Sequence, residues 1–285
     1  MANAREGHTA TLLADGTVLI AGGANDKDGA IQQAELFDPK TGQFSLTGSL
    51  TRGNSGDLAV LLADGRALAM SSHQADIYDP ATGTFNPTGA PVDAVSDAVG
   101  TLMSDGRVLI AGGWDGQSHT VSSAEIYDPR TGVFSATSSM SSPRHRLTAT
   151  SLADGRVLVV GGTTDTSRTV PFSEVYDPRQ GTFSQSGALI EPRAGNVAVR
   201  LSDGRVLIAG GTNARDRATA SSEVYDPGSG VFSRSGDMSV ERDFATATLL
   251  ADGRILVVGG VGIAQELHQS AELYDAATGT FSPAW

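Results

Sequence analysis

The chain has 285 residues and a formal net charge of −12, which argues against nucleic acid and anionic membrane surfaces as partners. It contains no cysteine, so disulfides, thiolate metal sites and cysteine nucleophiles are excluded. No apolar run approaches the roughly 20 residues of a membrane span, and one residue pattern fills the whole length. We therefore expect one domain, 1–285, without membrane insertion.

The pattern consists of a tight turn, a short apolar run and a glycine pair. Its clearest copy is 153–162, and the others are 14–23, 63–72, 104–113, 202–211 and 251–260. Neighbouring copies are 49 residues apart, except for one step of 41. A fixed period of this size indicates one supersecondary unit repeated six times.

The fourth repeat predicts four short strands in chain order. The first covers 144–151, and an Asp154-Gly155 turn of type I′ leads to the second, 156–160. The second strand is apolar on both faces, so both should be covered, and its glycine pair permits positive φ or a close backbone approach. The third covers 173–176, and an Asp-Pro turn leads to the fourth, 182–184.

Every repeat follows this plan. The third strands carry an acid at Glu35, Asp76, Glu125, Glu174, Glu223 and Glu272, and the fourth strands an aromatic at Phe44, Phe85, Phe134, Phe183, Phe232 and Phe281. Four short antiparallel strands per repeat with no helical pattern predict an all-β, six-bladed propeller. The expected blades are 1–47, 48–88, 89–137, 138–186, 187–235 and 236–285. A β-solenoid, the alternative, would need parallel coils and much shorter periods.

An apolar strand ending in Gly-Gly, followed by a tyrosine and then an aromatic, resembles the kelch repeat. In the third repeat these residues are 108–113, Tyr127 and Phe134. Kelch repeats usually carry Trp where this chain has Phe. The resemblance implies a propeller, but kelch-like propellers include protein-binding adaptors, galactose-oxidase-like copper enzymes and a sialic acid epimerase, and the fold does not choose among them.

In such a blade the Asp-Gly and Asp-Pro turns share one side, which we call the turn face. The loops after the glycine pairs and the crossovers between blades share the other, the variable face. At the start of the first strand, on the variable face, stand Arg5, Arg144, Arg193 and Arg242, with Asn54 and Val95 in the other two blades. These arginines predict an anion-binding mouth or, in the interpretation that their recurrence favours, structural ion pairs with the third-strand acids.

Three irregularities meet at blades 2 and 3. The loop at His73 is eight residues shorter than its counterparts, Val95 replaces the arginine, and Trp114-Asp115 follows a glycine pair. They predict a ligand in a notch beside the carboxylates of Asp57, Asp97 and Asp115, with Arg144, His145 and Arg146 supplying the opposite charge. Alternatively, Trp114 fills the gap itself.

No catalytic motif is recognisable. There is no nucleophile elbow and no phosphate loop, the histidines lack metal-binding spacing, and we expect neither metal nor cofactor. A copper site that resembles the one of galactose oxidase would include a cysteine-crosslinked tyrosine. Because the chain has no cysteine, the sequence does not support such a site.

The sequence as a whole favours a monomer with a non-catalytic role. We expect it to recognise a polar or acidic ligand, such as a peptide segment or a glycan, at the variable face. The alternatives are a carbohydrate-active enzyme similar to the sialic acid epimerase and a structural repeat domain of a larger cell-surface protein. The first repeat begins almost at once, at Arg5, and this suggests a piece of a longer protein. The sequence does not identify the compartment, and we favour a secreted or cell-surface fragment over a cytoplasmic protein.

Overall fold

The computed structural model describes residues 1–52 and 58–284, which form strands, turns and loops without any helix. It confirms an all-β, six-bladed propeller with four antiparallel strands in each blade. The chain divides into two compact units, which are described separately. Unit 1 consists of Met1–His119 and Ser123–Thr137, and unit 2 of Thr120–Ser122 and the residues from Ser138 onward. The change at Ser138 coincides with the expected border between blades 3 and 4.

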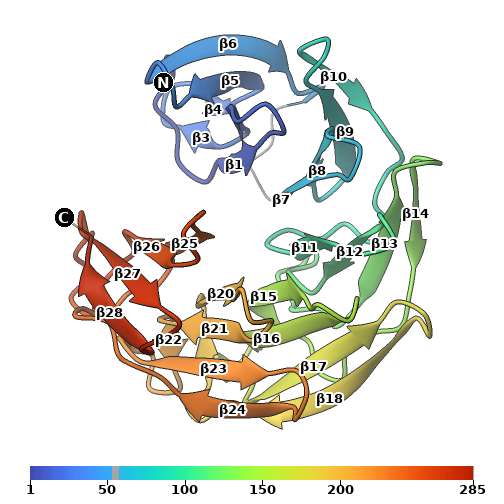
Figure 1. Cartoon of the computed structure of the whole chain (residues 1–285). Coiled ribbons are helices and arrows are strands. Elements are labelled where there is room, and N and C mark those ends of the chain that lie inside the picture. The colour runs from blue at the N-terminus through green and yellow to red at the C-terminus, as the bar shows by residue number, and fades with distance from the viewer. Residues whose placement is uncertain (53–57, 285) are drawn as a thin grey trace. The chain divides into compact units, whose positions relative to one another are not determined.

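Unit 1 contains blades 1 to 3, drawn from blue to green in Figure 1. Blade 1 consists of β1 (Thr9–Leu12), β2 (Val18–Ala21), β5 (Gln33–Asp38) and β6 (Gln43–Ser49), with β3 (Ala24–Asn25) and β4 (Gly29–Ala30) paired in a loop. Blade 2 consists of β7 (Leu58–Leu61), β8 (Ala67–Ser71), β9 (Gln74–Asp79) and β10 (Thr84–Pro87). Blade 3 consists of β11 (Val99–Leu102), β12 (Val108–Ala111), β13 (Ala124–Asp128) and β14 (Val133–Ala136).

Unit 2 contains blades 4 to 6, drawn from yellow-green to red in Figure 1. Blade 4 consists of β15 (His145–Ser151), β16 (Val157–Thr163), β17 (Phe172–Asp177) and β18 (Thr182–Ala188). Blade 5 consists of β20 (Val197–Arg200), β21 (Val206–Ala209), β23 (Ser222–Asp226) and β24 (Val231–Arg234), with β19 (Arg193–Ala194) paired to β22 (Thr212–Asn213). Blade 6 consists of β25 (Thr246–Leu249), β26 (Ile255–Val258), β27 (Ala271–Asp275) and β28 (Thr280–Pro283).

The second strand of each blade lies at the centre of its sheet and supplies the core. In β16, Leu158 and Val160 are at most 1% exposed and pack in one cluster with Val206 and Ile208 of β21. Burying a side chain of this size stabilises the fold by about 1.5–3 kcal/mol. Neighbouring blades of a unit are therefore held face to face by the apolar strands that the sequence pattern predicted.

The Asp-Gly turns differ from the predicted type I′. In blade 4 the pair Leu152 and Arg156 closes the turn, since the amide of Leu152 donates to the carbonyl of Arg156 at 2.8 Å. Three residues remain in the loop, and only Gly155 has a positive φ, 89°. Asp154 keeps an ordinary φ and accepts the Arg156 amide with its side chain at 3.0 Å. The prediction of type I′ was wrong because it counted two loop residues where the hydrogen bonds leave three.

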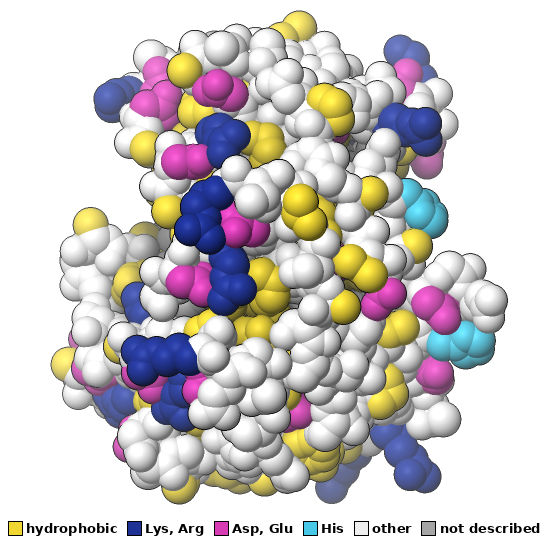
Figure 2. All heavy atoms as spheres, turned by 90° about the vertical axis from the view of Figure 1, so that its right-hand side faces the viewer, with side chains coloured by type: hydrophobic (Ala, Val, Ile, Leu, Met, Phe, Trp, Pro, Cys, Tyr) yellow, Lys and Arg dark blue, Asp and Glu magenta, His cyan; other side chains and the backbone are white. Residues whose placement is uncertain are grey.

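On the turn face, the arginine after each of five Asp-Gly turns pairs with the turn aspartate. Arg156 and Asp154, for example, are 2.7 Å apart, with side chains 38% and 45% exposed. In the side view of Figure 2, dark-blue basic side chains likewise lie next to magenta carboxylates. Exposed pairs of this kind are worth at most about 1 kcal/mol each, so they add little to the stability of the fold.

Candidate ligand-binding site

The recurrent arginines are buried in ion pairs within their own blades. Arg144, Arg193 and Arg242 of unit 2 have no exposed side-chain surface and lie 2.5, 3.0 and 3.1 Å from the acids Glu174, Glu223 and Glu272. Arg5 of unit 1 pairs in the same way with Glu35 at 3.1 Å. Burial lowers the pKa of Arg144 to about 10, although Glu174 opposes the shift. The ion-pair interpretation describes all four residues, and none of them presents its guanidinium to a ligand in this conformation.

Two residues beyond each arginine position, the backbone turns left-handed. Glycine occupies this place in blades 1 and 5, as Gly7 and Gly195 with φ of 63° and 66°. Blades 3, 4 and 6 instead place Asp97, Arg146 and Phe244 there, with φ of 53°, 55° and 54°. The blade 2 position lies outside the described residues. A left-handed conformation costs a non-glycine residue roughly 1–2 kcal/mol, and such strain concentrates at functional sites.

In unit 2 the three left-handed residues form a continuous backbone arc. The amide of Gly195 donates to the carbonyl of Arg146 at 2.8 Å, and the amide of Phe244 donates to the carbonyl of Gly195 at 3.3 Å. A Cβ on Gly195 would lie 2.3 Å from Asp243 Oδ1 and 2.8 Å from Arg146 Nη2. Glycine in the middle of the arc thus leaves room for the side chains on either side.

Those side chains form a compact polar cluster. Arg146 Nη2 donates to Asp243 Oδ2 at 2.5 Å, and Thr212 Oγ1 donates to the same oxygen at 2.7 Å. The Arg146 guanidinium carbon lies 4.2 Å from the centre of the Phe244 ring, a distance typical of cation–π contacts. Arg146 Nε is buried without a hydrogen-bond partner. The guanidinium is therefore held in place but has donor capacity left.

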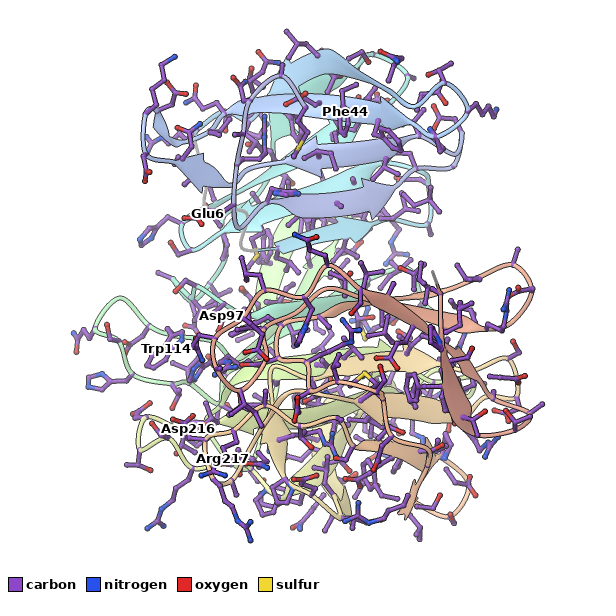
Figure 3. All side chains as sticks on the ribbon, turned by 90° about the vertical axis from the view of Figure 1, so that its left-hand side faces the viewer. Glu6, Phe44, Asp97, Trp114, Asp216 and Arg217 are labelled. Atoms are coloured by element: carbon purple, nitrogen blue, oxygen red, sulfur yellow. The ribbon has the colours of Figure 1, made fainter. Side chains whose placement is uncertain are left out.

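A pocket of about 250 Å³ opens over this cluster. Arg146, Asp243 and Phe244 line it together with loops that follow the glycine pairs of blades 5 and 6, including Asp216 and Arg217. Figure 3 labels Asp216 and Arg217 on one of these loops. Phe244 is 60% exposed as a residue, and the side chain of Arg146 is 21% exposed. The pocket combines an aromatic surface with a guanidinium and a carboxylate.

The remaining predicted residues of unit 2 lie beneath the surface. Arg144 is fully buried, and His145 is 7% exposed in β15, where its backbone pairs with Thr163. The pKa of His145 is lowered, mainly by burial and next by the charge of Arg146. Of the predicted site residues in this unit, only Arg146 lines the pocket.

In unit 1 the structure joins two of the predicted residues through the backbone. Trp114 exchanges two backbone hydrogen bonds with Ser96, at 2.8 and 2.9 Å, and Asp97 follows Ser96 directly. Figure 3 shows Asp97 and Trp114 on the same loop side of the unit. Trp114 is half-buried and Asp97 is exposed.

The structure does not bring the other predicted residues of unit 1 together into a site. Asp115 accepts the backbone amides of Gln117 and His119 at 2.8 and 2.9 Å, so its carboxylate stabilises its own loop. His73 is exposed in the short connection between β8 and β9. Asp57 lies outside the described residues. The notch beside these residues stays a prediction.

Asp243, Phe244 and Gly195 were not among the residues predicted from the sequence. A signal was present, because aligning the repeats two positions beyond the arginines places Gly7 and Gly195 beside Asp97, Arg146 and Phe244. Side chains standing where two other blades need glycine identify strained positions. The described residues contain no group of three or more His, Asp or Glu arranged to hold a metal ion. They also contain no helix long and apolar enough to span a membrane.

The kelch motif family matches residues 98–141, which lie mainly in blade 3. Together with the six four-stranded blades, this match supports a kelch-repeat propeller. No curated protein matches the sequence.

Two of the solved structures that are similar to this chain match it over 99% of its length. One is a fungal alcohol oxidase of the AA5 family in complex with copper, with a TM-score of 0.79 and 19% identity. The chain spans 65% of that protein's length. The other is YjhT, with a TM-score of 0.75 and 12% identity, of which 97% is covered. At these identities the likeness shows the fold alone.

Proposed function

We propose that this kelch propeller is a non-catalytic recognition module that binds a polar or acidic ligand at its variable face, through the pocket over Arg146, Asp243 and Phe244. The observation that carries the proposal is the partly exposed side chain of Arg146, which lines the pocket beside the exposed Phe244. A carboxylate of a peptide or a glycan can accept from this guanidinium. An apolar part of the same ligand can cover the aromatic ring.

The strain at the arc supports the same site. Arg146 and Phe244 keep a left-handed backbone that Gly195, between them, adopts without strain. A fold-stabilising role would favour glycine at all three positions. The two side chains are thus better explained by what they contact at the pocket.

Copper chemistry like that of the similar alcohol oxidase has no support in the donor set. No described His, Asp and Glu residues converge in a group that could hold a metal, and the chain has no cysteine. A peptide or glycan ligand held by hydrogen bonds and ring contact requires no such group.

The test begins with a peptide and glycan array, followed by calorimetry on the strongest binder. Arg146→Gln is expected to weaken binding about 10- to 100-fold, because a hydrogen bond to a charged group is worth about 1.5–3 kcal/mol. Phe244→Ala should weaken it through loss of the ring contact. Gly195→Ala should also weaken it, because the added Cβ collides with the Arg146–Asp243 pair.

The matched control is Arg205→Gln, which removes the same charge from the turn face of the same unit. Arg205 forms an exposed pair with Asp203 at 2.7 Å, so its loss should leave binding unchanged. Binding that weakens equally in the Arg146 and Arg205 variants would reject the site. Equal affinity in wild type, Arg146→Gln and Phe244→Ala would reject it as well.

A further inference from the structure

Blade 3 of unit 1 keeps a buried acid but lacks the arginine that pairs with it elsewhere. Blade 5 shows the complete arrangement, in which the guanidinium of Arg193 donates to Glu223 Oε1 at 3.0 Å and to the carbonyls of Gly210 and Ser221 at 2.9 and 2.8 Å. In blade 3 the acid is Glu125, 4% exposed, and Val95 stands at the arginine position. Blade 3 therefore keeps the hydrogen-bond acceptors but has no arginine of its own to pair with them.

Glu125 is only half satisfied by its surroundings. Its Oε2 accepts the amide of Val92 at 2.7 Å, whereas Oε1 is buried without a hydrogen-bond partner. The carbonyls of Gly112 and Ser123 occupy the places of Gly210 and Ser221, and the Gly112 amide donates to Ser123 at 3.1 Å, the same distance as in blade 5. The oxygens that receive a guanidinium in blade 5 are thus in register in blade 3.

A second carboxylate adds to the negative charge. Burial raises the pKa of Glu125 above its ordinary value of 4.5, and the charge of Asp93 raises it further, although the Val92 amide opposes the shift. In blade 5 the equivalent of Asp93 is Glu191, which lies 3.8 Å from Arg193. Blade 5 thus sets one arginine between two acids, and blade 3 keeps two acids without one.

We propose that Glu125, Asp93 and the carbonyls of Gly112 and Ser123 bind a guanidinium cation supplied by a ligand or by an arginine of a partner. The planar guanidinium matches these acceptors because four other blades present the buried acid and the two carbonyls to an arginine, whereas an ammonium is a point charge. Access comes from the side of Val92 and Asp93, since Val92 is 53% exposed and Asp93 is also exposed. This site is independent of the pocket in unit 2.

The experiment titrates the full chain with methylguanidinium chloride, and separately with N-acetylarginine amide, against sodium chloride of equal ionic strength. The Glu125 carboxyl carbon, assigned by its disappearance in Glu125→Gln, reports binding by NMR. We expect a saturable shift at pH 7.5. Glu125→Gln should weaken binding at least about tenfold, as measured by calorimetry, because it removes a charge-assisted hydrogen bond. Val95→Arg should abolish binding by filling the site from within the chain.

Asp26→Asn is the matched control, since it removes one carboxylate from an exposed loop of the same unit. Its binding should equal that of the wild type. Lowering the pH through the pKa of Glu125 should weaken binding, because a proton then competes for the same oxygen. A response to methylguanidinium no larger than that to sodium chloride would overturn the proposal, as would equal affinity in Glu125→Gln. Binding of methylguanidinium without N-acetylarginine amide would overturn the partner arginine as the source and leave a small ligand.

Discussion

Replacing Arg193 by alanine tests the interpretation that the recurrent arginines hold their blades together. Arg193 has no exposed side-chain surface, and its loss leaves Glu223, equally buried, without a cation. Breaking a buried pair by removing one partner typically costs about 3–5 kcal/mol. Glu223 retains the amides of Ile190 and Glu191 at 2.8 and 2.9 Å, so we expect the lower end, about 3 kcal/mol.

The assay is urea denaturation of the wild type, Arg193→Ala, Glu223→Gln and the double variant. If the pair is structural, the two single changes are strongly non-additive, because each removes the same interaction.

Two results would refute this reasoning. The first is a loss of less than about 1 kcal/mol in Arg193→Ala at pH 7.5, the range of an exposed ion pair. The second is additivity in the double variant. Either would mean that the arginines do not stabilise their blades, and it would return them to the anion-binding interpretation.

Three further predictions concern Phe244, His145 and Trp114. Phe244→Gly relieves a left-handed strain of roughly 1–2 kcal/mol at an added backbone entropy of about 0.5–1 kcal/mol, so urea denaturation should show unchanged or slightly higher stability, and a clear loss would contradict it. The pKa of His145 is lowered from its ordinary 6.5, so the neutral side chain stabilises the fold above pH 6.5, and this contribution is lost as the pH falls through the lowered pKa. His145→Gln should therefore flatten the loss of thermal stability between pH 7 and 5, and an unchanged slope would disprove it. In a Trp285→Phe variant, the emission of the half-buried Trp114 should respond to acrylamide, and complete protection would instead favour a tryptophan that fills the notch.

The blades could be predicted from the sequence because each depends on local patterns repeated in register. The strand predicted at 173–176 is Phe172–Asp177 in the structure, and that at 144–151 is His145–Ser151. The burial of the second strand could also be predicted, since a run of apolar residues must be covered on both faces. The turn type could not be predicted, because it depends on which backbone pair closes the loop.

The candidate site was largely hidden because its members come together only in three dimensions. Arg146, Gly195 and Phe244 follow one another at steps of 49 residues in the sequence, and the residues next to each of them do not indicate a pocket. The ion pairs of the arginines were among the alternatives, yet recurrence alone could not separate a buried pair from an exposed ring. In the structure these arginines have no exposed side-chain surface, so they form buried pairs and not an exposed ring.

A repeated fold makes its own departures interpretable. The pair of Arg193 and Glu223 recurs because an unpaired buried charge destabilises the fold. Glu125 lacks its arginine and keeps one buried oxygen without a hydrogen-bond partner. Arg146 and Phe244 keep a left-handed backbone at a position where glycine would not be strained. Both kinds of departure reduce stability, and both lie at the variable face. The apolar packing between neighbouring blades, such as that of β16 against β21, offsets these losses.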